Sequence, residues 1–490
     1  MLEKRIDVLA YAVRPRVVLK YCGQLGLMLG LLTLAPLIFA LLNTEWLQVE
    51  RYSIVCLCLF LVGGLLARLP APARIQGNEA LSVTAITFLL ASLLMSWPMM
   101  DSGIAYMDAL FEAVSGVTTT GLSTLGGIEG RSNTFLFARA WMQWYGGLGI
   151  IILSVALLMG HQAVARRLTD PVESGDTLVT TARMHARHTL LVYLSLTLLG
   201  LILIWSLSGD GTTALLHVLS AVSTGGFASH DASLAGLSSR PAAIAIMAIS
   251  FLGAVSLPLY WRVVHAGWRK GLRDVFADVE LRALLLACLL VGALLSWLGW
   301  LHGVTAPWFQ GMMMGISAQT TTGFATQAVS DMDAGSKVVM IISMLIGGSV
   351  GSSAGGVKIL RLLILLRLLQ LMLRRTVVPP HAVVQPALAG QRLEADDMIR
   401  AMQVILLFVM ITLLSWSAFV FMGYEPLDAL FEVASATGTV GLSSGIARPE
   451  LEAVLKGVLC FDMLAGRLEI IALLVILYPR NWFGRREEVQ

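Results

Sequence analysis

The chain has 490 residues, of which 57% are hydrophobic and only 13% are charged. A soluble protein of this size carries about a quarter charged residues, and here the apolar residues form repeated long runs. This composition excludes a soluble globular protein and indicates a multi-pass membrane protein, in contact with lipid. The net charge of +3 gives no indication of nucleic-acid binding.

The first 20 residues are basic and mixed, and they lack the apolar core and small-residue cleavage site of a signal peptide. We therefore expect the first apolar run to remain as a transmembrane helix. A span needs about 20 residues, and ten runs approach or exceed this length. They are 21–42, 53–67, 80–100, 135–160, 189–208, 241–261, 282–301, 336–374, 399–422 and 451–478.

Lysine and arginine fall mostly on one side of these runs. With the N-terminus inside, 25 lie in inside segments and 6 in outside segments. Cytoplasmic loops carry the excess of such residues, so the N-terminus is expected to be cytoplasmic. Three cations, Arg139, Lys358 and Arg467, remain within spans or at their edges.

This orientation requires that four short apolar segments on the outer side do not cross the membrane. They are 107–117, 212–222, 306–318 and 426–436. Each is too short to span, so each is expected to be a re-entrant half-helix.

A short polar loop that ends in glycine follows each half-helix. The loops are Thr118-Thr119-Thr120-Gly121, Ser223-Thr224-Gly225-Gly226, Thr320-Thr321-Thr322-Gly323 and Gly438-Thr439-Val440-Gly441. The final glycines lie 105, 97 and 118 residues apart, and each interval holds two spans and one half-helix. Such regular spacing indicates an internal repeat.

We therefore expect an all-α polytopic membrane protein with fourfold pseudosymmetric helix–pore loop–helix repeats, as in K⁺ channels. Two leading transmembrane helices precede the repeats. The expected units are 1–75 for the two-helix domain, then repeats at 76–180, 181–275, 276–395 and 396–490.

The chemistry of these loops suits a monovalent cation. Rings of backbone carbonyls can replace the hydration shell of an ion, and glycine permits the irregular backbone that this requires. The C-terminal ends of the half-helices would favour a cation on the axis. The loops contain no Asp or Glu, which a divalent cation usually needs. A single loop of this kind would be interpreted as a turn, and the filter interpretation depends on all four loops. A pore of the same architecture that carries Na⁺ or NH₄⁺ is the alternative function.

These loops resemble the Trk/Ktr/HKT superfamily of K⁺ transporters, and most closely its TrkH/TrkG membrane subunits. The motifs are Thr118–Gly121, Ser223–Phe227, Thr320–Phe324, Gly438–Ser443 and Trp144-Tyr145-Gly146-Gly147-Leu148-Gly149. The resemblance covers essentially the whole chain. It implies that the four loops form a selectivity filter that binds K⁺, with the key glycines at Gly121, Gly226, Gly323 and Gly441.

The run 336–374 is interrupted by Gly347, Gly348, Gly351, Gly355 and Gly356, together with three serines. This composition cannot hold a stable helix. The resemblance implies an intramembrane gating loop at 347–358, below the filter; a simple helix kink is the alternative. Lys358, at the end of this segment, could meet the loop carbonyls or a carboxylate.

Arg467 lies in the middle of the last expected span. A charge at that depth is costly and usually faces a cavity or a partner. The resemblance implies a pore-lining arginine that limits the path. Pairing with Glu469 or Glu432 is the structural alternative. Glu112 and Glu432, at matching places on half-helices, are expected to support the backbone and not to bind ions.

The resemblance implies K⁺ uptake across the bacterial inner membrane by a homodimer controlled by a cytosolic TrkA-type subunit that binds nucleotide. The chain has neither a Gly-x-Gly-x-x-Gly motif after a strand nor a Walker motif, so no cofactor is expected in this chain. Candidate docking surfaces are 161–187, 262–281 and 375–398. Coupling to H⁺ or Na⁺ stays open. An intramembrane enzyme is not expected, because no His-Glu-x-x-His or Gly-x-Ser-x-Gly motif is present.

Overall fold

The computed structural model describes residues 12–72, 75–101, 103–161, 178–266, 268–377, 379, 386–389 and 391–483. The three expected docking surfaces lie partly outside these residues. The described residues are mostly helical. The α-helices are α2 (Pro15–Leu42), α3 (Trp46–Ala67), α4 (Gly77–Ser96), α5 (Tyr106–Val117), α6 (Asn133–His161), α8 (Leu178–Ser208), α9 (Gly211–Val222), α10 (Arg240–Ala254), α11 (Leu257–Ala266), α12 (Trp268–Ala277), α13 (Val279–Leu301), α14 (Pro307–Gln319), α15 (Ala334–Ile346), α16 (Ile359–Arg375), α17 (Ala395–Phe421), α18 (Pro426–Thr437), α19 (Ala453–Arg467), α20 (Ile471–Leu477) and α21 (Arg480–Phe483).

Long apolar helices form a bundle whose outer faces suit lipid. By length and composition, six described helices can cross a membrane, or seven if one bent pair counts as a span. Large apolar side chains are exposed on α3, α8, α13 and α17, where lipid tails would cover them. The run 53–67, which was too short by itself, is extended by its flank into the 22-residue α3. The fold class expected from the sequence, a polytopic helical membrane protein, is therefore confirmed.

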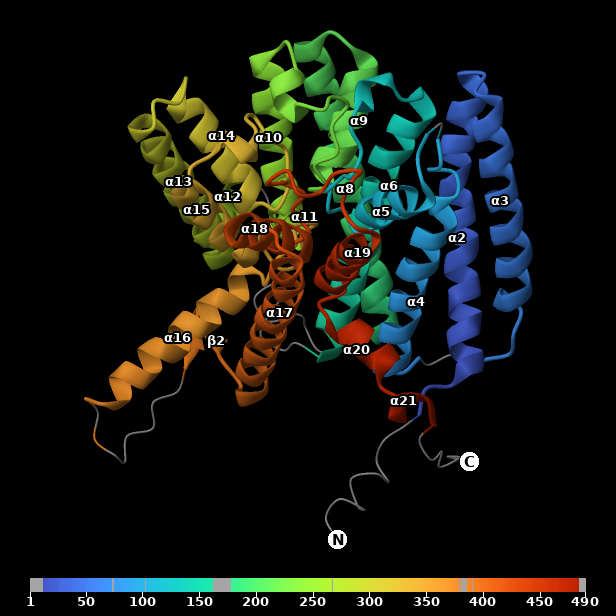
Figure 1. Cartoon of the computed structure of the whole chain (residues 1–490). Helices are drawn as coiled ribbons and strands as arrows, with labels where there is room; N and C mark the ends of the chain where they lie inside the picture. Colours follow the sequence, from blue (N-terminus) through green and yellow to red (C-terminus); the bar gives the residue numbers. More distant parts are fainter. Residues whose placement is uncertain are drawn as a thin grey trace.

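The α2–α3 hairpin stands at one edge of the bundle, and α16 projects from the opposite edge (Figure 1). The start of α2 and the end of the described chain are joined, because the Val13 backbone N–H donates to the Asn481 carbonyl at 2.7 Å. A short antiparallel pair, β1 (Ala387–Leu388) and β2 (Gln391–Arg392), lies beside α16. Arg367 of α16 donates to the Ala387 carbonyl at 2.8 Å and holds the pair there.

All four expected half-helices are present as α5, α9, α14 and α18, each of 12 or 13 residues. Local signals fix their starts. Proline occupies the first turn of α14 and α18, where its missing N–H costs nothing. Asp210 caps α9 by accepting from the N–H groups of Thr212 and Thr213. The hydrogen bonds from Thr213 lower the pKa of Asp210.

Three of the expected spans are broken. The interruption expected at 347–358 is present, since α15 ends at Ile346 and α16 begins at Ile359. The runs 241–261 and 451–478 were expected to be continuous, and this was wrong. They divide into α10 and α11, which meet at 90°, and into α19 and α20.

The first unexpected break has a local and a tertiary cause. Pro258 has no backbone N–H, so it cannot donate to the Ala254 carbonyl four residues earlier and continue the helix. The backbone groups released at this break bond to the 347–358 segment instead: Ala254 accepts from Ser349 N–H at 3.2 Å, and Leu257 N–H donates to Gly351 at 3.1 Å. At the second break, Glu469 and Ile470 both adopt positive φ, at 51° and 64°.

Candidate cation pathway

The four loops after the half-helices share one backbone conformation. In each, the second residue and the final glycine have positive φ. The pairs are Thr119 at 54° and Gly121 at 86°, Thr224 at 52° and Gly226 at 77°, Thr321 at 52° and Gly323 at 84°, and Thr439 at 49° and Gly441 at 96°. Threonine pays a steric penalty for positive φ, so its recurrence at the same place in four loops indicates that tertiary contacts impose it.

A serine in each half-helix anchors the loop that follows. The N–H of the third loop residue donates to a serine carbonyl five residues earlier, at 2.8–2.9 Å in every case. The pairs are Thr120 with Ser115, Gly225 with Ser220, Thr322 with Ser317, and Val440 with Ser435. The serine repeat therefore belongs to the same pattern as the glycines, although the sequence analysis did not use it.

The four final glycines form a closed ring in chain order. A Cβ atom placed on each would lie 1.9–2.2 Å from a carbonyl oxygen of the next loop. These contacts are Gly121 to Gly225, Gly226 to Thr322, Gly323 to Val440, and Gly441 back to Thr120. Such distances leave no room for any side chain, so glycine is required where neighbouring loops converge.

Two buried glutamines support this region, one at the second loop and one at the start of the 347–358 segment, and the sequence analysis missed both. Gln143 of α6 donates to the Gly225 carbonyl at 2.5 Å and accepts from Ser220 and the Phe227 N–H. Gln319 of α14 donates to the Gly347 carbonyl at 2.8 Å. A glutamine in an apolar helix was the available signal, because a buried amide needs several partners.

Two ion pairs each join a longer helix to a half-helix from another part of the chain, on the side where the half-helices begin. Lys456 of α19 meets Asp108 of α5 at 2.5 Å, and Lys337 of α15 meets Asp428 of α18 at 2.7 Å. The two aspartates occupy the same place in the Asp-Ala-Leu-Phe-Glu sequence that the first and fourth half-helices share. Each pair fastens the helix after one loop to a neighbouring half-helix.

The glutamates of the same motif hold structure, as expected. Glu112 pairs with Arg139 at 2.8 Å and accepts from Ser123. Glu432 accepts from the hydroxyls of Ser443 and Ser444 at 2.8 Å each. Among the described residues, no group of three or more His, Cys, Asp or Glu side chains could hold a metal ion.

The 347–358 segment lies directly against the second residues of three loops. Gly355 N–H donates to the Thr321 hydroxyl at 2.6 Å. The Thr224 hydroxyl lies 3.3 Å from that of Ser353. A Cβ on Gly355 would lie 2.1 Å from the Thr439 hydroxyl oxygen. The segment therefore covers one face of the ring, and the separate conformation expected for Gly347 to Gly356 is found.

Arg467 contacts this segment, and it pairs with no carboxylate in the described part of the chain. It is 3% exposed, and its Nη1 donates to the Ser353 carbonyl at 2.7 Å, while Nη2 lies 3.5 Å from the Gly146 carbonyl. Pairing with Glu469 or Glu432 is therefore wrong. Glu469 pairs instead with Arg361 at 2.5 Å, a contact that the sequence analysis missed.

Lys358 takes one of its two expected roles, because its ammonium donates to the Ala354 carbonyl within the same segment. Arg361, one turn further on, also donates to the Val357 carbonyl at 2.9 Å. Lys358, Arg361 and Arg467 thus each donate to a backbone carbonyl of the 347–358 segment. These hydrogen bonds fix the conformation of the segment.

Comparisons with known proteins agree with this architecture. Residues 55–482 match the family model described as TrkH, cation transport protein. An uncharacterized cation transporter of Methanocaldococcus jannaschii is 27% identical over 462 residues, 94% of either chain. The Trk system potassium uptake protein TrkH of Escherichia coli K12 is 28% identical over 426 residues, covering 82% of this chain and 83% of its own. The crystal structure of the potassium transporter TrkH from Vibrio parahaemolyticus matches with a TM-score of 0.84 and 26% identity, over 96% of this chain and all of that one.

Proposed function

Since the chain belongs to the TrkH family of cation transport proteins, we propose that it takes up K⁺ across the bacterial inner membrane through the ring of four loops. The observation that carries this proposal is the closed glycine ring, in which each final glycine lies against a backbone carbonyl of the next loop. Four loops supply several oxygens per layer without fixed charge, which suits a dehydrated monovalent cation. The selectivity filter would comprise 118–121, 223–226, 320–323 and 438–441.

The 347–358 segment is the proposed gate. It covers the ring through Gly355 and Ser353, and Arg467 holds it there. A buried arginine beside the path repels a cation, because charges interact strongly where water is excluded. Moving this segment would uncover the ring and remove Arg467 from Ser353 in one step.

Control of this gate is assigned to a partner. We place a cytosolic nucleotide-binding subunit of the TrkA type against the side on which α2 begins and α16 ends, with the membrane chain as a homodimer. Arg374 and Arg375 are exposed at the end of α16, where they can meet an acidic surface. Nucleotide-dependent flux only when the purified partner is present would support this arrangement.

The filter assignment is tested by Gly121→Ser in purified protein in vesicles. The added side chain meets the Gly225 carbonyl, so the ring must distort. We expect the K⁺ over Na⁺ permeability ratio to fall about tenfold, the change that 1.4 kcal/mol produces. Gly126→Ser is the matched control, since nothing lies within 4 Å of a Cβ at Gly126.

Unchanged ratios in Gly121→Ser would remove these loops from the selectivity filter. Equal or greater flux of Na⁺ or NH₄⁺ in the unaltered protein would replace K⁺ as the cargo while leaving the pathway in place. Flux measured with and without a Na⁺ or pH gradient tells whether transport is coupled to either ion.

A further inference from the structure

The third residue of each loop is not held in the same way. In the first loop the hydroxyls of Thr118 and Thr120 bond to each other at 2.8 Å. In the third loop Thr320 and Thr322 form the same bond at 2.7 Å. The second loop has Gly225 at this position, so it has no side chain that could form such a bond. A group from outside the second loop must therefore fix its third residue.

Gln143 of α6 occupies the place of the missing side chain. A Cβ on Gly225 would lie 2.8 Å from Nε2 of Gln143 and closer still to its Cδ and Oε1. Nε2 donates to the Gly225 carbonyl at 2.5 Å, while Oε1 accepts from the Ser220 hydroxyl at 2.6 Å and from the Phe227 N–H at 3.2 Å. The same Gly225 carbonyl lies against Gly121 of the first loop. The Gln143 amide therefore holds one of the carbonyls that form the ring.

One face of α6 follows the second loop in steps of about one helical turn. Residues four apart lie on the same face of a helix. The contacts are Gly147 with Ser223, Gln143 with Gly225, and Arg139 with Phe227. A Cβ on Gly147 would lie 2.9 Å from the Cβ of Ser223, and the Arg139 guanidinium carbon lies 3.8 Å from the centre of the Phe227 ring. Contacts on both sides of Gln143, which is fully buried, fix the place of its amide.

The corresponding positions of two other helices carry no amide. Three glycines are equivalent, because a Cβ on each would overlap the carbonyl of the residue just before a loop. They are Gly146 of α6, Gly253 of α10 and Gly466 of α19. The residues three positions earlier are Gln143, Ser250 and Met463. Ser250 donates to the Ile246 carbonyl within its own helix at 2.9 Å, and methionine has no N–H or O–H to donate.

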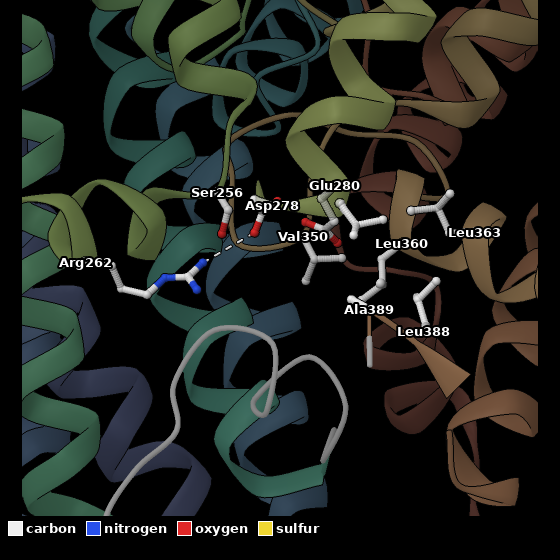
Figure 2. A pocket seen from close by; sticks show the side chains of 10 residues that line it. Ser256, Arg262, Asp278, Glu280, Val350, Leu360, Leu363, Leu388 and Ala389 are labelled. Carbon is white, nitrogen blue, oxygen red and sulfur yellow. Dashed lines mark hydrogen bonds and ion pairs between the residues drawn. The ribbon is translucent and has the colours of Figure 1, made fainter. Parts of the chain in front are cut away.

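The fourth loop is supported from its own half-helix, since the Gly441 N–H donates to the Ser435 hydroxyl at 3.0 Å. A pocket lies beside the 347–358 segment, between the break before α11, the start of α13, α16 and β1, but none of the described residues that line it belongs to the four loops (Figure 2). The second loop thus takes the support of its third residue from α6, whereas the other loops take theirs from within the loop or from their own half-helix.

We propose that Gln143 is a positioning residue for cation selectivity, which takes the place of the missing loop threonine and holds the Gly225 carbonyl in the ring. This inference rests on the proposed function, in which the ring is the selectivity filter. Rings of carbonyls discriminate between ions by the size and the field of the site that they form. A Gly225 carbonyl that has lost its donor can move, and the preference for K⁺ over Na⁺ then falls.

The first test is Gln143→Ala in the purified full chain in vesicles. The change leaves the Gly225 carbonyl, the Ser220 hydroxyl and the Phe227 N–H without their partner, and we expect the K⁺ over Na⁺ permeability ratio to fall about tenfold. Gln143→Met, which keeps the volume but cannot donate, should lower the ratio as well and serves if Gln143→Ala does not fold. Gln48→Ala is the matched control, because Gln48 is a buried glutamine of α3 with no amide partner among the described residues. Its ratio should stay unchanged.

The second test asks whether Gln143 takes the place of a threonine. Gly225→Thr alone overlaps the Gln143 amide and should also lower the ratio. In the double variant with Gln143→Ala there is room for the new side chain, and its hydroxyl can reach that of Ser223 as Thr120 reaches Thr118. The backbone of Gly225 does not have positive φ, so it accepts a threonine. The ratio of the double variant should therefore lie above that of either single variant.

An unchanged ratio in Gln143→Ala or Gln143→Met, while Gly121→Ser lowers it, overturns the role of Gln143. A double variant no better than the worse single variant overturns the replacement of a threonine. Unchanged ratios in Gly121→Ser as well would remove the filter and this selectivity role with it. Thermal unfolding in detergent needs no transport: the double variant should lose less stability than the two single variants together, and simple addition contradicts the shared contact whatever the protein carries.

Discussion

At the scale of single residues, Arg467 shows how a buried charge is satisfied without a counter-ion. Its guanidinium donates to the Ser353 carbonyl at 2.7 Å, and the carboxylates first considered as partners are engaged elsewhere. An arginine held by carbonyls keeps its full charge unneutralised. In the proposed pathway, its field acts on a cation that reaches the face of the ring covered by the 347–358 segment.

Replacing Arg467 by Ala should raise K⁺ flux in the absence of a partner by about tenfold, the effect of roughly 1.4 kcal/mol on a barrier. Both the repulsive charge and the hydrogen bond that holds the gate are lost. Arg467→Lys keeps the charge and serves as the control, with a smaller rise expected. Radiotracer uptake into vesicles measures both, and equal flux in all three proteins would leave Arg467 with a structural role only.

At the scale of elements, three interrupted helices meet beneath the ring. The α10–α11 break bonds to the segment between α15 and α16 through Ala254 and Leu257. The end of α19 reaches the same segment through Arg467, and Glu469, two residues further on, pairs with Arg361 of α16. The 347–358 segment, the proposed gate, is thus enclosed by helix ends, whose released backbone groups supply its partners.

A methyl group on Gly355 should open this arrangement. The Cβ of Gly355→Ala would meet the Thr439 hydroxyl and the Gly438 carbonyl at 2.1 and 2.2 Å, so the segment must move away from the fourth loop. We expect higher partner-independent flux, by several-fold, with K⁺ selectivity kept. Gly149→Ala provides the control, because a Cβ there has nothing within 4 Å. Flux that falls or stays constant in a well-folded Gly355→Ala protein would contradict the gate.

At the scale of the whole molecule, an ion pair joins α19, late in the chain, to α5, the first half-helix. Lys456 and Asp108 are 348 residues apart in the chain and meet at 2.5 Å, with both side chains nearly buried. Lys337 of α15 and Asp428 of α18 form a second pair at 2.7 Å, with the Asp428 side chain 29% exposed. Breaking one partner of a buried pair leaves an uncompensated charge, which is strongly unfavourable.

The Asp108→Asn protein should therefore lose about 3–5 kcal/mol of stability, measured by thermal or denaturant unfolding in detergent. The double variant with Lys456→Met should lose less than the sum of the two single changes, because the residues share one contact. Glu129→Gln, at the exposed pair with His230, is the control, and a change within about 1 kcal/mol is expected. If the stability losses of Asp108→Asn and Lys456→Met simply added in the double variant, the two residues would not stabilise the protein through a shared contact.

The sequence by itself determined the elements whose cause is local. Apolar run length separated spans from the half-helices α5, α9, α14 and α18, and the glycine-rich composition of 347–358 predicted the break there, because helix formation and span length depend on neighbouring residues. Only the tertiary structure decided that α10–α11 and α19–α20 are broken, that Arg467 binds Ser353 and not Glu469, and that Lys456 closes the ring onto Asp108. Those features depend on which distant groups meet, and a buried donor or acceptor takes whichever partner the packing brings within reach.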